Sequence, residues 1–156
     1  MLTKESIDDL IEDISKEDLD NVLYDSLNWL ISTFGENSII TNNTNYILKY
    51  SPLKPYTTKK HLKVGWGYNP NKLNWFYYGQ WAQYTCENNE IVVHCIKNKT
   101  LRFTLECFFH EFRHSQQCMR EYFNFKGSYV NHPLEHDANN FCYEYVPIFW
   151  EHFTKQ

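Results

Sequence analysis

The sequence predicts an α+β fold, in which helices at both ends of the chain pack against a short, mostly antiparallel sheet. Apolar residues recur at helical spacing near the N-terminus and over the last third of the chain, whereas the middle is rich in aromatic and β-branched residues. A length of 156 residues suits one compact domain, and an aromatic content of 18% is typical of an ordered fold. We therefore expect a single domain over residues 1–156, with an N-terminal helical segment at 1–35, a sheet region at 60–97 and further helices at 100–122 and 133–153.

The N-terminal segment has the apolar spacing of two helices over residues 4–34. Ser15-Lys-Glu-Asp18 resembles a capping box and predicts the start of the second helix, and Gly35 is well placed to end it. The apolar stripe consists of Ile7, Leu10, Ile11, Ile14, Val22, Leu23, Leu30 and Ile31.

Three segments are predicted as strands. Residues 62–69 and 74–84 are β-like in their aromatic content and are separated by the turn-forming sequence Asn-Pro-Asn-Lys. Residues 90–97, Glu-Ile-Val-Val-His-Cys-Ile-Lys, give the clearest strand pattern. The sheet is therefore expected to come just before the helix at 100–122.

Composition excludes several classes of protein. No segment approaches the roughly 18 consecutive apolar residues that a membrane-spanning helix needs. The N-terminus is acidic and lacks the apolar core of a signal peptide, so we expect a cytoplasmic protein without a membrane partner. Five cysteines without any Cys-x-x-Cys pair favour reduced thiols over a disulfide framework or a cysteine-ligated zinc site.

The charge is unevenly distributed. Residues 37–86 contain six lysines and no acid, and aromatic residues are interleaved with the lysines of segment 54–84. Lysines and aromatic rings together can bind single-stranded nucleic acid by phosphate attraction and base stacking. The net charge of −4 favours the alternative, an aromatic-rich sheet with a solvated rim of lysines.

The expected helix at 100–122 carries a His-Glu-x-x-His motif, formed by His110, Glu111 and His114. Histidines four residues apart lie one above the other on a helix, so both imidazoles can reach one Zn²⁺ ion. The motif lies opposite the apolar stripe of this helix, and Glu111 is placed to act as a general base toward water at the metal. A catalytic zinc site needs a third protein ligand as well.

The third ligand is expected from the helix at 133–153. Glu121 shares the histidine face but lies seven residues beyond His114, roughly 10 Å along the helix axis. Glu135 lies on one flank of the buried face of the later helix. Its carboxylate could instead complete a capping arrangement, but the upstream motif favours Glu135 as the ligand.

Four other residues near Glu135 have side chains that can bind a metal or support its ligands. His136 points nearly opposite the buried face, toward solvent. Asn139 lies one turn after Glu135 on the same side, and Asp137 lies on the other flank. His132, just before Pro133 at the helix start, is left open as an alternative ligand.

A His-Glu-x-x-His helix followed by Glu135-His-Asp137-Ala-Asn139-Asn-Phe141 resembles the gluzincin metallopeptidases, and most of all their ImmA/IrrE-type group. The resemblance spans about residues 90–147. It implies a small zincin-like (minigluzincin) domain with Zn²⁺ as cofactor and Glu135 as the third ligand. It further implies that Asn139, with Asp137 in place of the family's second glutamate, supports the ligands without touching the metal.

Two other roles follow from the resemblance. In zincins an edge strand before the metal helix holds the substrate backbone, and residues 90–97 are the candidate for that strand. A tyrosine or histidine commonly stabilises the transition state in gluzincins, and Tyr129 is the candidate for that role. The chain departs from the ImmA-type pattern at Arg113, where the family usually has glycine, and at Cys142, where it has alanine.

Three functions are consistent with the motifs. The first is a zinc metallopeptidase that cleaves a protein or peptide substrate with His110, His114 and Glu135 as ligands and Glu111 as base. The second is a nucleic-acid-associated protease resembling SprT-like proteins, with His132 as third ligand. The third is a non-catalytic zincin-like module for binding or inhibition. The abundance of Asn, Lys and Tyr is compatible with a phage or mobile-element protein.

Overall fold

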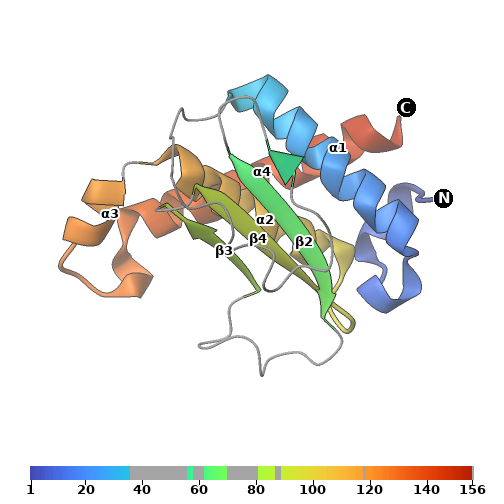
Figure 1. The fold of residues 1–156 in the computed structure, drawn as a ribbon, viewed down its shortest axis with the longest axis horizontal. Coiled ribbons are helices and arrows are strands. Elements are labelled where there is room, and N and C mark those ends of the chain that lie inside the picture. The colour runs from blue at the N-terminus through green and yellow to red at the C-terminus, as the bar shows by residue number, and fades with distance from the viewer. Residues whose placement is uncertain (36–55, 58–61, 70–80, 87–88, 118, 156) are drawn as a thin grey trace.

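The fold of the protein, seen in a computed structural model, is α+β, as the sequence predicts. The structure describes residues 1–35, 56–57, 62–69, 81–86, 89–117 and 119–155 (Figure 1). The α-helices in these residues are α1 (Lys16–Phe34), α2 (Leu101–Gln116), α3 (Met119–Asn124) and α4 (Pro133–Thr154). The strands are β1 (Tyr56–Thr57), β2 (Lys63–Asn69), β3 (Ala82–Thr85) and β4 (Glu90–Ile96).

The strand order in the sheet is β1-β2-β4-β3. The β1/β2 and β3/β4 pairs are antiparallel and the β2/β4 pair is parallel. Because β4 lies between β2 and β3, the prediction that residues 90–97 form an edge strand is wrong. The edge strand next to α2 is β3. The predicted strand at 74–84 is described only from residue 81 onward, and most of the basic segment 54–84 lies outside the described residues.

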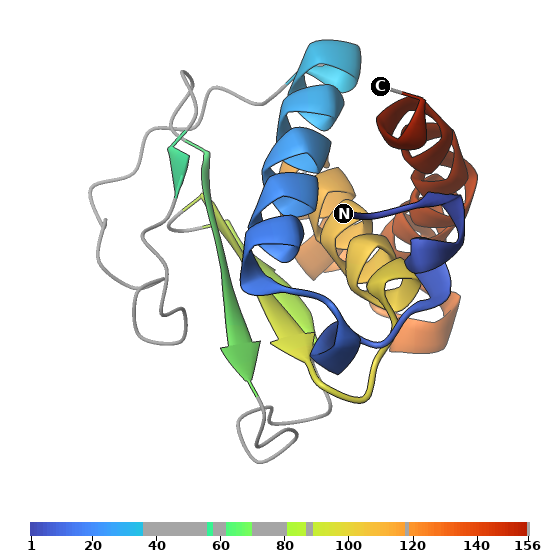
Figure 2. The same cartoon turned by 90° about the vertical axis from the view of Figure 1, so that its right-hand side faces the viewer.

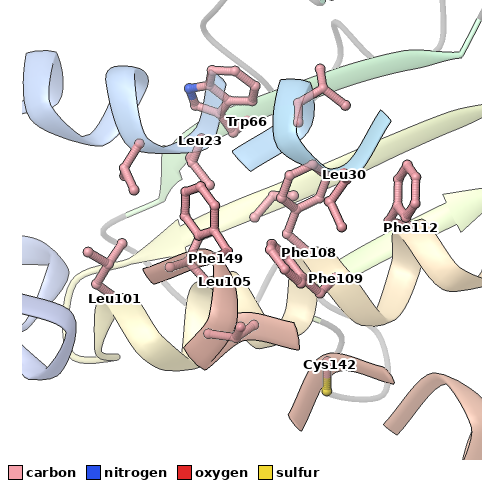
Figure 3. Packing of buried hydrophobic residues seen from close by; sticks show 14 of the residues in the cluster. Leu23, Leu30, Trp66, Leu101, Leu105, Phe108, Phe109, Phe112, Cys142 and Phe149 are labelled. Atoms are coloured by element: carbon pink, nitrogen blue, oxygen red, sulfur yellow. The ribbon is translucent and has the colours of Figure 1, made fainter. Parts of the chain in front are cut away.

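The helices lie on one side of the sheet. Figure 2 shows α1 and α2 against the sheet, with α4 beyond α2. The side chains of Phe108, Phe109 and Phe112 on α2 are fully buried in this arrangement. Figure 3 shows Phe108 and Phe109 close to Leu30 of α1, and Phe112 and Phe149 belong to the same buried cluster. Burial of each phenylalanine contributes about 1.5–3 kcal/mol, so the apolar stripe of α2 fixes the rotation of the helix about its axis.

The N-terminal residues differ from the prediction. Residues 4–14 form two 3-10 turns, η1 (Lys4–Asp8) and η2 (Ile11–Asp13), rather than an α-helix. The backbone of this segment bonds to the start of α2, because Ile11 N–H donates to Lys99 O and Leu101 N–H donates to Asp9 O, both at 2.9 Å. These bonds compete with helical ones. The second predicted helix is confirmed as α1.

Both ends of α1 have the predicted caps. The Ser15 hydroxyl accepts a hydrogen bond from Asp18 N–H at 3.1 Å, which satisfies one of the free donors of the first turn. Gly35 ends the helix with φ of 76°, in the left-handed region that favours glycine, and its N–H donates to Ile31 O.

The helix predicted at 100–122 is interrupted at Gln117. Gln117 has an extended backbone, with φ of −85° and ψ of 162°, so α2 ends at Gln116 and the separate helix α3 begins at Met119. The predicted helix at 133–153 is confirmed as α4. Its start is as predicted too, with His132 as N-cap and Pro133 in the first turn.

Two predictions from composition bear on these residues. None of the helices that the structure describes combines the length and the apolar character needed to cross a membrane. Within the same residues, Cys86, Cys95, Cys107 and Cys142 are free thiols, as predicted. Cys118 lies outside the described residues.

Candidate metal centre

The two motif histidines and Glu135 meet where α2 and α4 pack against each other. His110 Nε2 lies 3.0 Å from Glu135 Oε1 and 3.0 Å from His114 Nε2, and His114 Nε2 lies 3.2 Å from Glu135 Oε2. The three residues form a compact cluster, in which His114 and Glu135 are buried and His110 is half-buried. The apolar stripe of α2 turns its histidine face toward α4, so packing of the core places these ligand atoms together.

The spacing of the three residues fits a tetrahedral zinc ion. With Zn–N and Zn–O bonds of about 2.0–2.1 Å, two ligand atoms in a tetrahedral site lie about 3.3 Å apart. The distance of 3.0 Å between the two histidine nitrogens is close to that value, and so are the distances of 3.0 and 3.2 Å from these nitrogens to the two different oxygens of Glu135. Two imidazole nitrogens and one carboxylate are also a donor set that zinc commonly takes. The residues present therefore fit a zinc ion with one coordination position left for water.

Gln117 fixes the tautomer of His114. The amide nitrogen of Gln117 donates to Leu134 O at 2.8 Å and to Asp137 Oδ2 at 2.9 Å, so its amide oxygen faces His114 Nδ1 at 2.6 Å. That oxygen can only accept, which means that Nδ1 carries the proton and that the lone pair of Nε2 points into the cluster. An orienting hydrogen bond of this kind is typical of metal-binding histidines.

Replacement of Gln117 by leucine is expected to weaken zinc binding by about 10- to 100-fold, because His114 Nδ1 then loses its acceptor. Titration with zinc against a competing chelator measures the affinity. Asn140→Leu, which changes an exposed amide of α4, is the matched control and should bind zinc like the wild type. Equal affinities in Gln117→Leu and Asn140→Leu would contradict an orienting role for Gln117.

Glu135 accepts hydrogen bonds from two tyrosines and lies beside both histidines. Tyr129 Oη donates to Glu135 Oε1 at 3.0 Å, and Tyr122 Oη donates to Glu135 Oε2. Burial raises the pKa of Glu135, but the neighbouring His110 and His114 rings and the hydrogen bond from Tyr122 outweigh burial and hold this pKa far below its usual range. Glu135 is therefore a carboxylate, the form that binds a metal.

Tyr122 is a site residue that sequence reasoning missed. On an uninterrupted helix it would lie eight residues beyond His114, roughly 12 Å along the axis. The break at Gln117 brings it back over the site, where its ring is 5.4 Å from the His114 ring. The predicted residue Tyr129 also reaches the site, from the 3-10 turn η6 (Tyr129–Asn131), although its side chain is largely exposed.

Glu111 lies beside the cluster and also contacts the edge of the sheet. Its Oε2 is 3.7 Å from His110 Nε2, and its Oε1 accepts a 2.7 Å hydrogen bond from Tyr84 N–H on β3. Burial raises the pKa of Glu111, although His114, His110 and the Tyr84 N–H act in the opposite direction. A carboxylate with a raised pKa next to a metal position is suited to accept a proton from water.

The remaining predicted residues lie around the cluster. Asp137 binds Arg113 through two hydrogen bonds, at 2.8 and 3.3 Å, and reaches His114 only through Gln117. Asn139 lines the cavity next to the cluster, and its amide has no hydrogen-bond partner within the described part of the chain. Asp137 therefore supports a ligand indirectly, whereas the Asn139 side chain makes no hydrogen bond to the three ligands in the described part of the chain.

His132 and His136 are not brought into the cluster. His132 Nδ1 accepts from Leu134 N–H at 3.1 Å, and its Nε2 faces Tyr122 O at 2.8 Å. Both ring nitrogens are thus used to cap α4 and to hold α3. His136 is exposed, as predicted from the helix pattern. His94 on β4 is half-buried and is not among the residues that line the cavity, and burial lowers its pKa to about 4.

A cavity of about 810 Å³ opens onto the cluster and gives access to the free side of the ligands. Its walls come from β3, α2, α3 and α4. Fold and site together define an α+β protein with a candidate metal centre of two histidines and one glutamate at the base of this cavity. Comparison with known protein families, with curated proteins and with solved structures finds no match to this chain.

Proposed function

We propose that the protein is a zinc-dependent metallopeptidase with a small zincin-like (minigluzincin) fold, similar to gluzincins of the ImmA/IrrE type. One observation carries the proposal, namely that the ligand atoms of His110, His114 and Glu135 converge beside Glu111 at the base of an open cavity. Three protein ligands with one open position are typical of catalytic zinc sites, whereas structural sites take four protein ligands. The position of the Glu111 carboxylate beside the ligands favours hydrolysis over metal storage.

Each residue of the site has a role in peptide hydrolysis. His110, His114 and Glu135 would hold the zinc ion, which would supply a Lewis acid to polarise the peptide carbonyl and to lower the pKa of water. Glu111 accepts a proton from the attacking water and carries it to the leaving amine. The hydroxyl groups of Tyr122 and Tyr129 donate to Glu135, and a hydroxyl that turned from Glu135 to the carbonyl oxygen would stabilise the negative charge that develops there.

The edge of β3 is suited to hold an extended peptide. His94 N–H donates to Trp81 O at 3.0 Å, so the backbone groups of Trp81 point toward β4. In an antiparallel pair the direction alternates along the strand, and the N–H and C=O groups of Ala82 and Tyr84 therefore point away from β4. Tyr84 N–H is taken by Glu111, and no described strand pairs with the side of β3 to which the backbone of Ala82 points, so this side is the candidate for pairing with substrate.

Metal removal tests the proposed function. Hydrolysis of a mixed peptide library, with products read by mass spectrometry, is expected to stop after treatment with a zinc chelator and to return when zinc is added. Magnesium is expected not to restore activity, because it prefers oxygen ligands in an octahedral arrangement. Undiminished cleavage by protein from which all metal has been removed would contradict the proposal.

A further inference from the structure

The cavity continues beyond the metal ligands along both helices that supply them. This part of the cavity, which we call the α2/α4 pocket, is lined by Phe103, Glu106 and Cys107 of α2 and by Asn139, Cys142 and Tyr143 of α4. The residue four positions before His110 is Glu106, so the pocket begins about 6 Å along the α2 axis from a metal ligand. A side chain next to the cleaved bond of a substrate can therefore enter it.

Glu106 is a half-buried carboxylate on α2. It makes no hydrogen bond and no ion pair within 4 Å to any residue that the structure describes. The nearest cation on α2, Arg102, is bound to Asp8 through two hydrogen bonds of 2.9 and 3.3 Å. Burial raises the pKa of Glu106, and Arg102 only partly opposes this. A cation that enters the pocket would stabilise the negative charge of this carboxylate by a charge-assisted hydrogen bond.

The other cation near the pocket is also engaged. Lys99 Nζ lies 5.2 Å from the centroid of the Trp81 ring and 5.1 Å from that of Phe103, which are cation–π distances. Lys99 does not line the cavity. Among the described residues, the lining contains no lysine and no arginine. Of the acids in the lining, Glu111 and Glu135 are used by the proposed mechanism, so Glu106 is left for recognition.

The walls of the pocket suit a long side chain that ends in a positive charge. The rings of Phe103 and Tyr143 offer apolar surface to a methylene chain, and the ring of Tyr143 offers a π-face to a cation. Cys107 and Cys142 add no charge, because burial raises the pKa of both thiols, that of Cys142 to about 12. An uncharged apolar side chain would instead bury the Glu106 carboxylate without a partner, which is unfavourable.

We propose that the α2/α4 pocket binds a lysine or arginine side chain of the substrate next to the cleaved bond, with Glu106 as the residue that determines this specificity. The inference rests on the proposed peptidase function and names its substrate class. Peptides with a basic residue at one fixed position relative to the cleavage site are the preferred substrates.

Matched peptides test the proposal. A randomised peptide library first locates the preferred cleavage position, and kcat/KM is then compared for peptides with arginine or its uncharged isostere citrulline at that position. We expect wild-type protein to favour arginine by about 10- to 100-fold, the range for a charge-assisted hydrogen bond. Glu106→Gln should lose this preference mainly by slower cleavage of the arginine peptide. Glu106→Lys should favour glutamate at the same position.

The control is Glu144→Gln, an exposed acid on α4 that does not line the cavity, and it should keep the preference. Zinc content and thermal unfolding of each variant show whether it is folded. A library cleaved without preference for basic residues, or a preference unchanged in Glu106→Gln, would overturn the inference while leaving the peptidase function intact.

Binding separates failure of the pocket from failure of the function. Fluorescently labelled arginine and citrulline peptides are titrated into the zinc-loaded Glu111→Gln variant, with and without Glu106→Gln. Tighter binding of the arginine peptide that is lost with Glu106→Gln supports the proposed role of the pocket. If wild-type protein also cleaves no peptide, the proposed peptidase function fails while the proposed role of the pocket stands. Equal binding of both peptides contradicts the pocket.

Discussion

Glu111→Gln is expected to abolish peptide hydrolysis while zinc stays bound. Glutamine has nearly the same shape, and its amide oxygen can still accept the hydrogen bond from Tyr84 N–H, so the geometry at the edge of β3 is kept. The amide cannot accept a proton at neutral pH. Loss of a general base costs about 10²- to 10⁴-fold in rate. The measurement is kcat/KM on a cleaved peptide, with zinc content determined on the same sample.

The control for this variant is Glu121→Gln, which changes an exposed acid on α3 that is outside the cavity lining. It should cleave at the wild-type rate. If Glu111→Gln cleaves as fast as Glu121→Gln, another group accepts the proton and the mechanism proposed above is wrong.

Glu135→Ala is expected to remove both the metal and the activity. The substitution leaves two histidine nitrogens, and it takes the acceptor away from the hydroxyls of Tyr122 and Tyr129. Loss of a hydrogen bond to a ligand, such as that of Gln117, is expected to weaken zinc binding by about 10- to 100-fold. Loss of the ligand Glu135 itself should weaken zinc binding by more than that. Zinc content after dialysis and affinity in competition with a chelator measure the effect.

His114→Ala should behave in the same way, and His136→Ala is its matched control, because His136 is an exposed histidine on α4 outside the cluster. His136→Ala should retain zinc. A Glu135→Ala or His114→Ala protein that holds zinc as tightly as His136→Ala would show that the metal, if present, binds elsewhere.

The meeting of His110, His114 and Glu135 could be predicted from helix geometry. The apolar stripe of α2 and the buried face of α4 determine which side chains of the two helices face each other. The same pattern predicts that Glu135 faces the neighbouring helix and that His136 faces solvent, in a helix that begins after the N-cap His132. Long amphipathic helices with capped ends carry enough information in their sequence for this kind of inference.

The positions of Gln117 and Tyr122 at the site could not be predicted, because they depend on a helix break without a sequence signal. The apolar spacing of α2 continues past Gln117, and no glycine or proline stands there. The extended backbone of Gln117 allows its side chain to bond with His114 and Asp137, and these tertiary hydrogen bonds outweigh helix propensity. The position of Tyr122 over the site follows from the same break.

The order of the strands in the sheet could not be predicted from the sequence either. Residues 90–97 have the strongest strand pattern because they are buried in the middle of the sheet, and that same burial excludes them as an edge. The open edge is the short strand β3, whose sequence pattern is weaker. The 3-10 turns at residues 4–13 were missed for a comparable reason, since their backbone bonds to residues 97–101 are set by tertiary packing.

The zinc content of the wild-type chain, purified without added zinc, shows whether His110, His114 and Glu135 hold a metal ion. Elemental analysis with native mass spectrometry of the same sample is expected to give one zinc ion per chain, held by His110, His114 and Glu135. This zinc should be absent from Glu135→Ala prepared in parallel. A folded wild-type chain that contains no zinc and binds none when zinc is supplied would contradict the account and would favour a non-catalytic binding module.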